Sequence, residues 1–306
     1  MNTIRSANTS ARKPFTITAA SHTFLLGPRT HIMGIVNVTP DSFSMDGCWH
    51  PAKGPERAVR LALKHIREGA DIIDLGGEST RPGAARISIK EEIRRVIPMV
   101  QALSKKRNIP ISVDTYKPAV AKAALDAGAG IINNIMGTKP QASLLRMIKN
   151  YKAAVVLMHM RGTPRTMQTR LVYRNVIAEI IGALRISIEK CLEIGIKSDK
   201  IIIDPGIGFA KTVEQNLKIL NRLEDFKTLN RPLLIGTSRK SFIGKVLGKD
   251  VRDRLLGTAA TVCASILNGA HIVRVHDVKA VRETAVMADA ILNEHFHKLN
   301  CTLNSF

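Results

Sequence analysis

The chain has 306 residues, of which 45% are hydrophobic and 23% are charged, so it can bury a large core and is not expected to be disordered. Its formal net charge of +21 fits a solvated basic surface, the attraction of an anionic substrate, or nucleic-acid binding. Because aromatic residues make up only 4% of the chain and its apolar runs are shorter than a membrane span, we expect neither a nucleic-acid partner nor a membrane.

The N-terminal segment is basic. Residues 1–30 contain basic but no acidic side chains, among many Ser, Thr and Ala residues, a composition that a transit peptide shares. A frayed tail that leads into a short strand near residues 24–26 explains this composition more simply. We therefore expect residues 1–20 to be a disordered basic tail and residues 21–306 to form the folded domain.

From His31 onward, short apolar runs rich in β-branched residues alternate with longer segments of helical periodicity, a pattern typical of βα units around a parallel sheet. Eight such runs are predicted to be strands: 31–38, 71–76, 110–114, 130–135, 153–159, 200–204, 232–236 and 271–276. Eight strands that alternate with helices close into a barrel of about 250 residues. Since no Pro-, Gly- or Ser-rich linker divides the chain, the predicted fold is α/β: a single (β/α)8 TIM barrel with a short N-terminal extension.

Three helices are well signalled between these strands. Apolar residues recur at helical spacing over 89–103, and the Ser88–Glu91 segment has the spacing of a capping box. A second stripe covers 176–192, and Gly195 is placed to end that helix. Over 255–267 the apolar positions nearly surround the helix, which indicates burial on more than one side, as against a second subunit.

The cysteines give no sign of a metal site or a redox motif. They are far apart in the sequence, at Cys48, Cys191, Cys263 and Cys301. Cys191 and Cys263 stand among aliphatic residues, as ordinary buried thiols do in a reducing compartment. We therefore expect a cytoplasmic protein.

Polar side chains stand at the carboxyl ends of the predicted strands. In a (β/α)8 barrel these ends form one rim, where the active site lies. For any single residue, capping of the following helix is an alternative role, but every predicted strand brings a polar side chain to this rim. The rim residues include Asn37, Ser79, Thr80, Arg81, Asp114, Asn133, Asn134, His159, Asp204, Ser238, Lys240, Ser241, Arg274 and His276.

The rim residues fall into two chemical groups. Asp114, Asn133 and Asp204 suit the donor-rich edge of an aminopyrimidine-type heterocycle. A cationic and hydroxyl-bearing group suits phosphate. It consists of Ser79, Thr80, Arg81, Lys240, Arg274 and His276. Asn37 offers an oxygen ligand to a hard divalent ion that also touches the phosphate. The rim therefore predicts a site for a phosphorylated heterocycle.

Seven segments carry longer motifs. They are MGIVNVTPDSFS at 33–44, DIIDLGGESTRPGA at 71–84, SVDTYKPAVA at 112–121, LMHMRGTPRTMQ at 157–168, DPGIGFAKT at 204–212, GTSRKSFIG at 236–244 and RVHDV at 274–278. Together they resemble the dihydropteroate synthase family, and the resemblance runs from about residue 30 to residue 292. It implies a (β/α)8 barrel, in agreement with the strand count, and a homodimer formed through the last helices.

The resemblance also implies the reaction. The family condenses 6-hydroxymethyl-7,8-dihydropterin diphosphate with 4-aminobenzoate, with Mg2+ assisting the loss of diphosphate before the arylamine attacks. By motif position, the implied pterin residues are Asp114, Asn133, Asp204, Phe209 and Lys240. The implied diphosphate residues are Asn37, Thr80, Arg81, Arg274 and His276, with Mg2+ at Asn37. The implied 4-aminobenzoate residues, which sulfonamide drugs also address, are Phe43, Pro82 and Ser241. The implied catalytic residues are Asp114, Lys240, Arg274 and His276.

Four positions depart from the family pattern. Met45 lengthens the first loop, Asn134 stands where Asp is usual, Ala210 replaces a usual Gly, and Tyr116 replaces a frequent Ser. Two other functions remain open: a pterin-dependent methyltransferase with the same barrel, and a pterin-binding paralogue without turnover. The cationic rim residues argue against the methyltransferase, which transfers no diphosphate.

Overall fold

Eight parallel strands form the centre of the molecule. The computed structural model describes residues 12–39, 55–79, 84–106, 109–163, 166–167 and 171–294. Within these ranges the sheet order is β8-β7-β6-β5-β4-β3-β10-β9. A parallel bridge between Ile203 and Leu233 joins the two ends of this order and closes the barrel. All eight predicted strands are confirmed, as β3 (His31–Asn37), β4 (Ile72–Gly76), β5 (Ile111–Asp114), β6 (Ile131–Asn134), β7 (Ala154–Met158), β8 (Ile201–Asp204), β9 (Leu234–Ile235) and β10 (Ile272–Val275).

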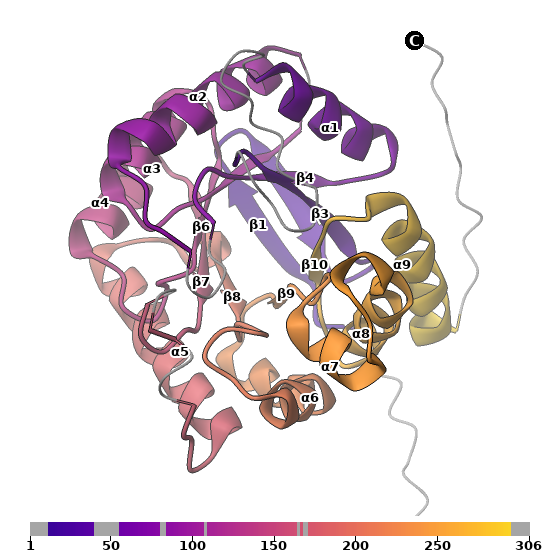
Figure 1. The fold of residues 1–306 in the computed structure, drawn as a ribbon. Helices are drawn as coiled ribbons and strands as arrows, with labels where there is room; N and C mark the ends of the chain where they lie inside the picture. The colour runs from indigo at the N-terminus through magenta and orange to yellow at the C-terminus, as the bar shows by residue number, and fades with distance from the viewer. Residues whose placement is uncertain are drawn as a thin grey trace, which may run out of the picture.

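Helices surround the strands as an outer ring (Figure 1). In the described ranges they are α1 (Glu56–Arg67), α2 (Ile89–Lys106), α3 (Pro118–Asp126), α4 (Ala142–Asn150), α5 (Val176–Ile194), α6 (Val213–Asn221), α7 (Ser241–Leu247), α8 (Leu255–Leu267) and α9 (Val278–Asn293). Short 3-10 helices are η1 (Ser198–Lys200), η2 (Leu223–Leu229) and η3 (Val251–Asp253). The main core lies between strands and helices, and the predicted (β/α)8 barrel is confirmed. Among the helices of the described part, none is both long and apolar enough to cross a membrane.

The predicted helix ends are only partly reproduced. The Ser88 hydroxyl accepts a hydrogen bond from the Glu91 N–H at 3.1 Å, as a capping box requires. The Glu91 carboxylate, however, accepts hydrogen bonds from Arg94 and Arg95, so it is engaged along the helix. At the end of α5, Gly195 adopts φ +93, and the predicted glycine stop is confirmed.

An N-terminal hairpin covers the amino-terminal end of the barrel. β1 (Phe15–Ala19) pairs antiparallel with β2 (His22–Leu26), which confirms the short strand predicted near residues 24–26. The buried face of the hairpin packs on the first inward-facing residues of the barrel strands, in one cluster with Met33, Ile72, Ile131, Ala154, Val156, Ile202, Leu234 and Ile272. The expected disordered tail is therefore wrong for residues 12–20, because Ile17 and Ala19 alternate with polar residues and bury one strand face. Residues 1–11 lie outside the described ranges.

Arg12 links the start of this hairpin, through hydrogen bonds, to the segments that precede β3 and β10 and to α9. Its buried guanidinium donates to the Thr30 hydroxyl at 2.6 Å, to the Ala270 carbonyl at 2.7 Å and to the Asp289 carboxylate at 2.5 Å. Because an unpaired buried guanidinium is costly, these three acceptors fix where the N-terminal segment enters the fold.

Candidate active site

A buried charge cluster lies at the carboxyl ends of the barrel strands. Arg274 on β10 donates to Asp74 on β4 at 2.6 Å and to Asp114 on β5 at 2.9 Å. The Asn133 amide on β6 donates to the same oxygen of Asp74 at 3.2 Å. Four strands thus bring an arginine, two carboxylates and an amide together, as the predicted rim requires.

Sequence reasoning missed Asp74. The signal was a carboxylate inside the otherwise apolar β4, where its side chain is fully buried. A buried carboxylate needs partners, and Arg274 and Asn133 supply them here. Asp74 therefore orients Arg274 from a fully buried position, and its own carboxylate is not exposed to solvent.

The Asp114 carboxyl has a strongly shifted pKa. Burial raises the pKa of its carboxyl to about 7, and the Asp74 charge adds to this, while Arg274 opposes it. Its Oδ1 is buried and accepts no hydrogen bond from any residue in the described ranges. Since buried acceptors are normally paired, this oxygen is suited to a ligand that brings an N–H donor.

Asp204, Phe209 and Lys240 form the adjoining part of the site. Asp204 accepts a hydrogen bond from the Gly206 N–H at 2.7 Å, and burial raises the pKa of its carboxyl. The Lys240 ammonium lies 4.4 Å from the centroid of the Phe209 ring and donates to the Ile207 carbonyl. Burial lowers the pKa of Lys240 to about 8, while Asp204 favours its charged form. This aromatic ring, ammonium and carboxylate suit a flat polar heterocycle.

Lys211 is a second buried lysine, which sequence reasoning did not single out. It donates to the carbonyls of Gly206 and Phe209, both at 2.9 Å, and its Nζ lies 3.2 Å from His159 Nδ1. Burial lowers the pKa of Lys211 to about 7 and that of His159 to about 2. Lys211 therefore holds the loop after β8, and with it the Phe209 backbone, against the end of β7.

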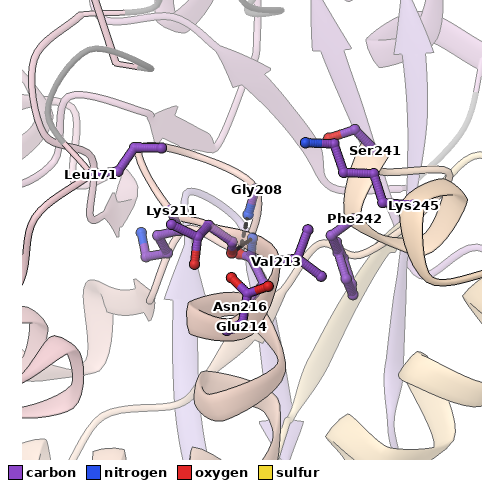
Figure 2. Close-up of a pocket in the computed structure, with 10 residues that line it drawn as sticks. Leu171, Gly208, Lys211, Val213, Glu214, Asn216, Ser241, Phe242 and Lys245 are labelled. Carbon is purple, nitrogen blue, oxygen red and sulfur yellow. Dashed lines mark hydrogen bonds between the residues drawn. The ribbon is translucent and has the colours of Figure 1, made fainter.

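His276, Ser238 and Ser241 complete the described rim. The Ser238 hydroxyl accepts a hydrogen bond from the His276 backbone N–H at 3.2 Å, and the same hydroxyl lies 3.0 Å from Nδ1 of the His276 ring. Ser241 begins α7 and faces a cavity of about 290 Å³ between the β8–α6 segment and α7 (Figure 2). Gly208 and Lys245 also line this cavity, whereas the buried cluster of Asp74, Asp114, Asn133 and Arg274 does not.

Asn37 ends β3 beside Gly76. A Cβ atom on Gly76 would lie 3.6 Å from Asn37 Oδ1 and 3.8 Å from the Asp114 Cβ, so the glycine leaves a recess between these two residues. The described residues contain no group of three or more His, Cys, Asp or Glu side chains placed to hold a metal. One amide oxygen over a recess suits Mg2+ that is held mainly by water and phosphate.

A second buried network lies behind the rim and was also missed. The Lys117 ammonium donates to Glu78 and Glu92, both at 2.6 Å, and to the Ile87 carbonyl at 2.8 Å. Glu78 also accepts from the Tyr116 hydroxyl at 2.7 Å and from the Ile87 N–H at 3.0 Å. The network therefore joins the two ends of the segment between Glu78 and Ile87, and Tyr116, a departure from the family pattern, takes part in it.

The structure brings nine of the predicted site residues to one rim. They are Asn37, Asp114, Asn133, Asp204, Phe209, Lys240, Ser241, Arg274 and His276. The other four predicted residues lie outside the described ranges, namely Phe43, Thr80, Arg81 and Pro82.

Comparison with known proteins identifies the family. Residues 33–276 match the family described as pterin binding enzyme. The chain belongs to this family. It is 46% identical to the dihydropteroate synthase of Synechocystis sp. over 87% of its own length and 91% of that protein. It is 43% identical to the dihydropteroate synthase of Escherichia coli, over 88% and 94% of the two chains.

Solved structures agree with these relatives. The Yersinia pestis dihydropteroate synthase with a sulfonamide drug superposes with a TM-score of 0.86 at 39% identity, over 91% of this chain and all of that one. The Xanthomonas albilineans dihydropteroate synthase with 4-aminobenzoic acid gives 0.83 at 38% identity, over 91% and 98%. The resemblance to dihydropteroate synthases that the motifs indicate is confirmed.

Proposed function

We propose that the protein condenses 6-hydroxymethyl-7,8-dihydropterin diphosphate with 4-aminobenzoate, as a transferase of folate biosynthesis that releases 7,8-dihydropteroate and diphosphate. The observation that carries this proposal is the buried Asp114 carboxylate, whose Oδ1 lacks a donor among the described residues. The amino and ring N–H groups of a pterin supply such donors. A solved relative determined in the presence of pteroic acid, and another with 4-aminobenzoic acid, support the choice of substrates.

In the proposed complex the pterin lies across the Asp114 cluster. Asp114 and Asp204 accept its N–H groups, Asn133 contributes its amide, and Lys240 donates to a ring acceptor beside Phe209. The support is that these side chains converge while their carboxylates have raised pKa values, the mark of a desolvated polar pocket. In such a pocket each hydrogen bond to the ligand is stronger than in water.

The leaving diphosphate carries growing negative charge as the carbon–oxygen bond breaks. Arg274 and His276 stabilise that charge, with Thr80 and Arg81 as further proposed partners from outside the described ranges. Asn37 would contribute one oxygen ligand to Mg2+, which when bound would supply additional positive charge there. The neutral arylamine then attacks the pterin methylene carbon and its surplus proton passes to solvent, so no dedicated general base is required.

The 4-aminobenzoate is proposed to lie beside the start of α7. Ser241 lines the cavity between the β8–α6 segment and α7, which supports this placement (Figure 2). Phe43 and Pro82 are the proposed walls from outside the described ranges. Lys240 packs against Gly208, which lines the cavity, so the amine is proposed to reach the pterin from the α7 side.

A homodimer is proposed through the last helices. Leu256 on α8 is 83% exposed, and Met287 on α9 is 61% exposed. Val246 and Leu247 on α7 and Ile291 on α9 are also exposed. An apolar surface of this kind indicates a partner.

Cys191 and Cys263 are free thiols, which supports the proposed cytoplasmic location.

Diphosphate release tests the proposal directly. We expect release from the pterin diphosphate only when 4-aminobenzoate and Mg2+ are present, with dihydropteroate formed in equal amount, and we expect Lys240→Ala to lose most of the turnover. Methyl transfer from methyltetrahydrofolate to a corrinoid would instead favour the methyltransferase. Pterin binding without any release would favour the paralogue that lacks turnover.

A further inference from the structure

Arg239 has an unusual backbone conformation for its position. It immediately precedes Lys240 and adopts φ +56, in the left-handed region that residues with a Cβ atom disfavour. Such a conformation persists only where the surrounding structure imposes it, and it is found most often at functional sites. The contacts of Arg239 show what imposes it here.

Both the side chain and the backbone of Arg239 are held. Its guanidinium donates to both carboxylate oxygens of Asp277, at 2.9 Å from Nε and 2.5 Å from Nη2. Its backbone N–H donates to the buried Thr258 hydroxyl at 3.0 Å. Its carbonyl accepts from Arg254 at 3.1 Å. A two-point guanidinium–carboxylate pair fixes orientation as well as distance.

The partner of Arg239 comes from a different strand end: Asp277 follows β10, whereas Arg239 follows β9. Asp277 directly follows His276, just as Arg239 directly precedes Lys240. The Ser238–His276 hydrogen bonds lie beside the ion pair and join the same two segments. The segment after β9 and the segment after β10 are thus linked twice, next to the residues proposed to hold pterin and diphosphate.

We propose that Arg239 and Asp277 are a positioning pair, which fixes Lys240 and His276 relative to each other. The inference rests on the roles proposed above for Lys240 and His276. The reaction needs the pterin and its leaving group held in one geometry, and small misplacements of such groups lower the rate steeply. The ion pair is largely buried, with 20% and 24% of the two side chains exposed, and its two-point contact fixes orientation as well as distance. Together with the strained backbone and the double link, it points to a role in geometry.

The test replaces each partner conservatively. Arg239→Lys keeps the charge but loses the two-point contact, and Asp277→Asn keeps the shape but loses the charge. We expect each variant to lower kcat/KM for the pterin diphosphate by about 10- to 100-fold. The matched control is Arg222→Lys, in an exposed Arg222–Asp225 pair at 2.6 Å, which should leave activity unchanged.

Two further measurements separate positioning from general destabilisation. The double variant Arg239→Lys/Asp277→Asn should lose no more activity than the stronger single variant, because both act through one contact. Lys240 sets the alkaline limb of the pH profile of kcat/KM, and it is surrounded by Asp204, Asp114 and Arg274. This limb should shift to higher pH in the variants, because Lys240 becomes more hydrated. A purely structural role would lower the thermal midpoint and leave this limb in place.

Lys240→Ala distinguishes failure of the pair from failure of the site. If Lys240→Ala is inactive while the Arg239 and Asp277 variants keep near-normal kcat/KM, the positioning pair is overturned and the site stands. If Lys240→Ala keeps near-normal turnover, the proposed role of Lys240 is overturned and the pair with it. Additive losses in the double variant would also overturn the pair.

Discussion

Asp114 and Lys240 lie in the same buried cluster, and burial moves both pKa values toward neutrality, to about 7 and about 8. Pterin binding as proposed needs Asp114 ionised and Lys240 protonated. Below about pH 7 the Asp114 carboxylate takes up a proton, becomes a donor at one oxygen and accepts more weakly, and above about pH 8 the Lys240 ammonium loses its charge. We therefore expect kcat/KM for the pterin diphosphate to have a narrow bell-shaped dependence on pH, with both limbs arising from the coupled titration of Asp114, Lys240 and their buried neighbours.

A pH profile of Lys240→Arg checks the alkaline side. Arginine stays protonated over this range, so the alkaline limb should disappear even if the maximal rate falls. A limb that persists unchanged in this variant would assign the titration to another group. The acid limb, which depends on Asp114, should remain.

Arg274 is also expected to stabilise the fold. Arg274→Ala would leave the fully buried Asp74 without its closest cation, so we expect a loss of about 3–5 kcal/mol in the free energy of unfolding at neutral pH. Urea titration measures this. The control Arg274→Ala/Asp74→Asn removes the stranded charge and should recover part of the loss; no recovery would contradict the explanation.

Ala210, which departs from the glycine that the family pattern implies at this position, adopts φ +52. The Tyr173 hydroxyl donates to the Ala210 carbonyl at 3.1 Å and helps to hold this conformation. We expect Ala210→Gly to stabilise the protein by about 1 kcal/mol, since glycine adopts the left-handed region without penalty. The same change at Ala127, which has φ −82, should not stabilise, and thermal melts of both variants compare the two.

Among the elements, the N-terminal hairpin has the clearest measurable role. A chain that begins at residue 21 lacks β1 and exposes the apolar floor formed by the barrel strands. We expect this chain to melt well below one that begins at Arg12, which keeps the whole hairpin, because burial contributes about 25 cal/mol per Å² of apolar surface. Equal melting of the two chains would show that β1 contributes nothing to stability.

At the scale of the whole molecule, the proposed homodimer depends on the exposed apolar side chains of α7, α8 and α9. We expect Leu256→Glu to convert a dimer to a monomer in sedimentation experiments, because it places a charge in the proposed apolar contact. The control Ile186→Glu, on the exposed face of α5, should leave the mass unchanged. A wild-type chain that is already monomeric at high concentration would refute the dimer.

At the same scale, the sequence was most informative where the signals are local. Strand and helix periodicity is written in neighbouring residues, so the eight strands and the rim at their ends were predictable. The partner of Asp74 stands 200 residues away, and Arg239 owes its backbone conformation to contacts from two later elements. Such roles arise only when the barrel closes, which is why Asp74, Lys211 and β1 escaped sequence reasoning.

The hydrogen bonds of Arg12 to Thr30, Ala270 and Asp289 have a consequence for the order of events during synthesis. Arg12 is among the first described residues to leave the ribosome, yet its acceptor Asp289 is made 277 residues later. The hairpin it anchors must also wait for Ile272 on the last strand. Contacts of such long sequence separation slow folding. We therefore expect full docking of the hairpin to follow the synthesis of β10 and α9, so that it completes the barrel rather than begins it.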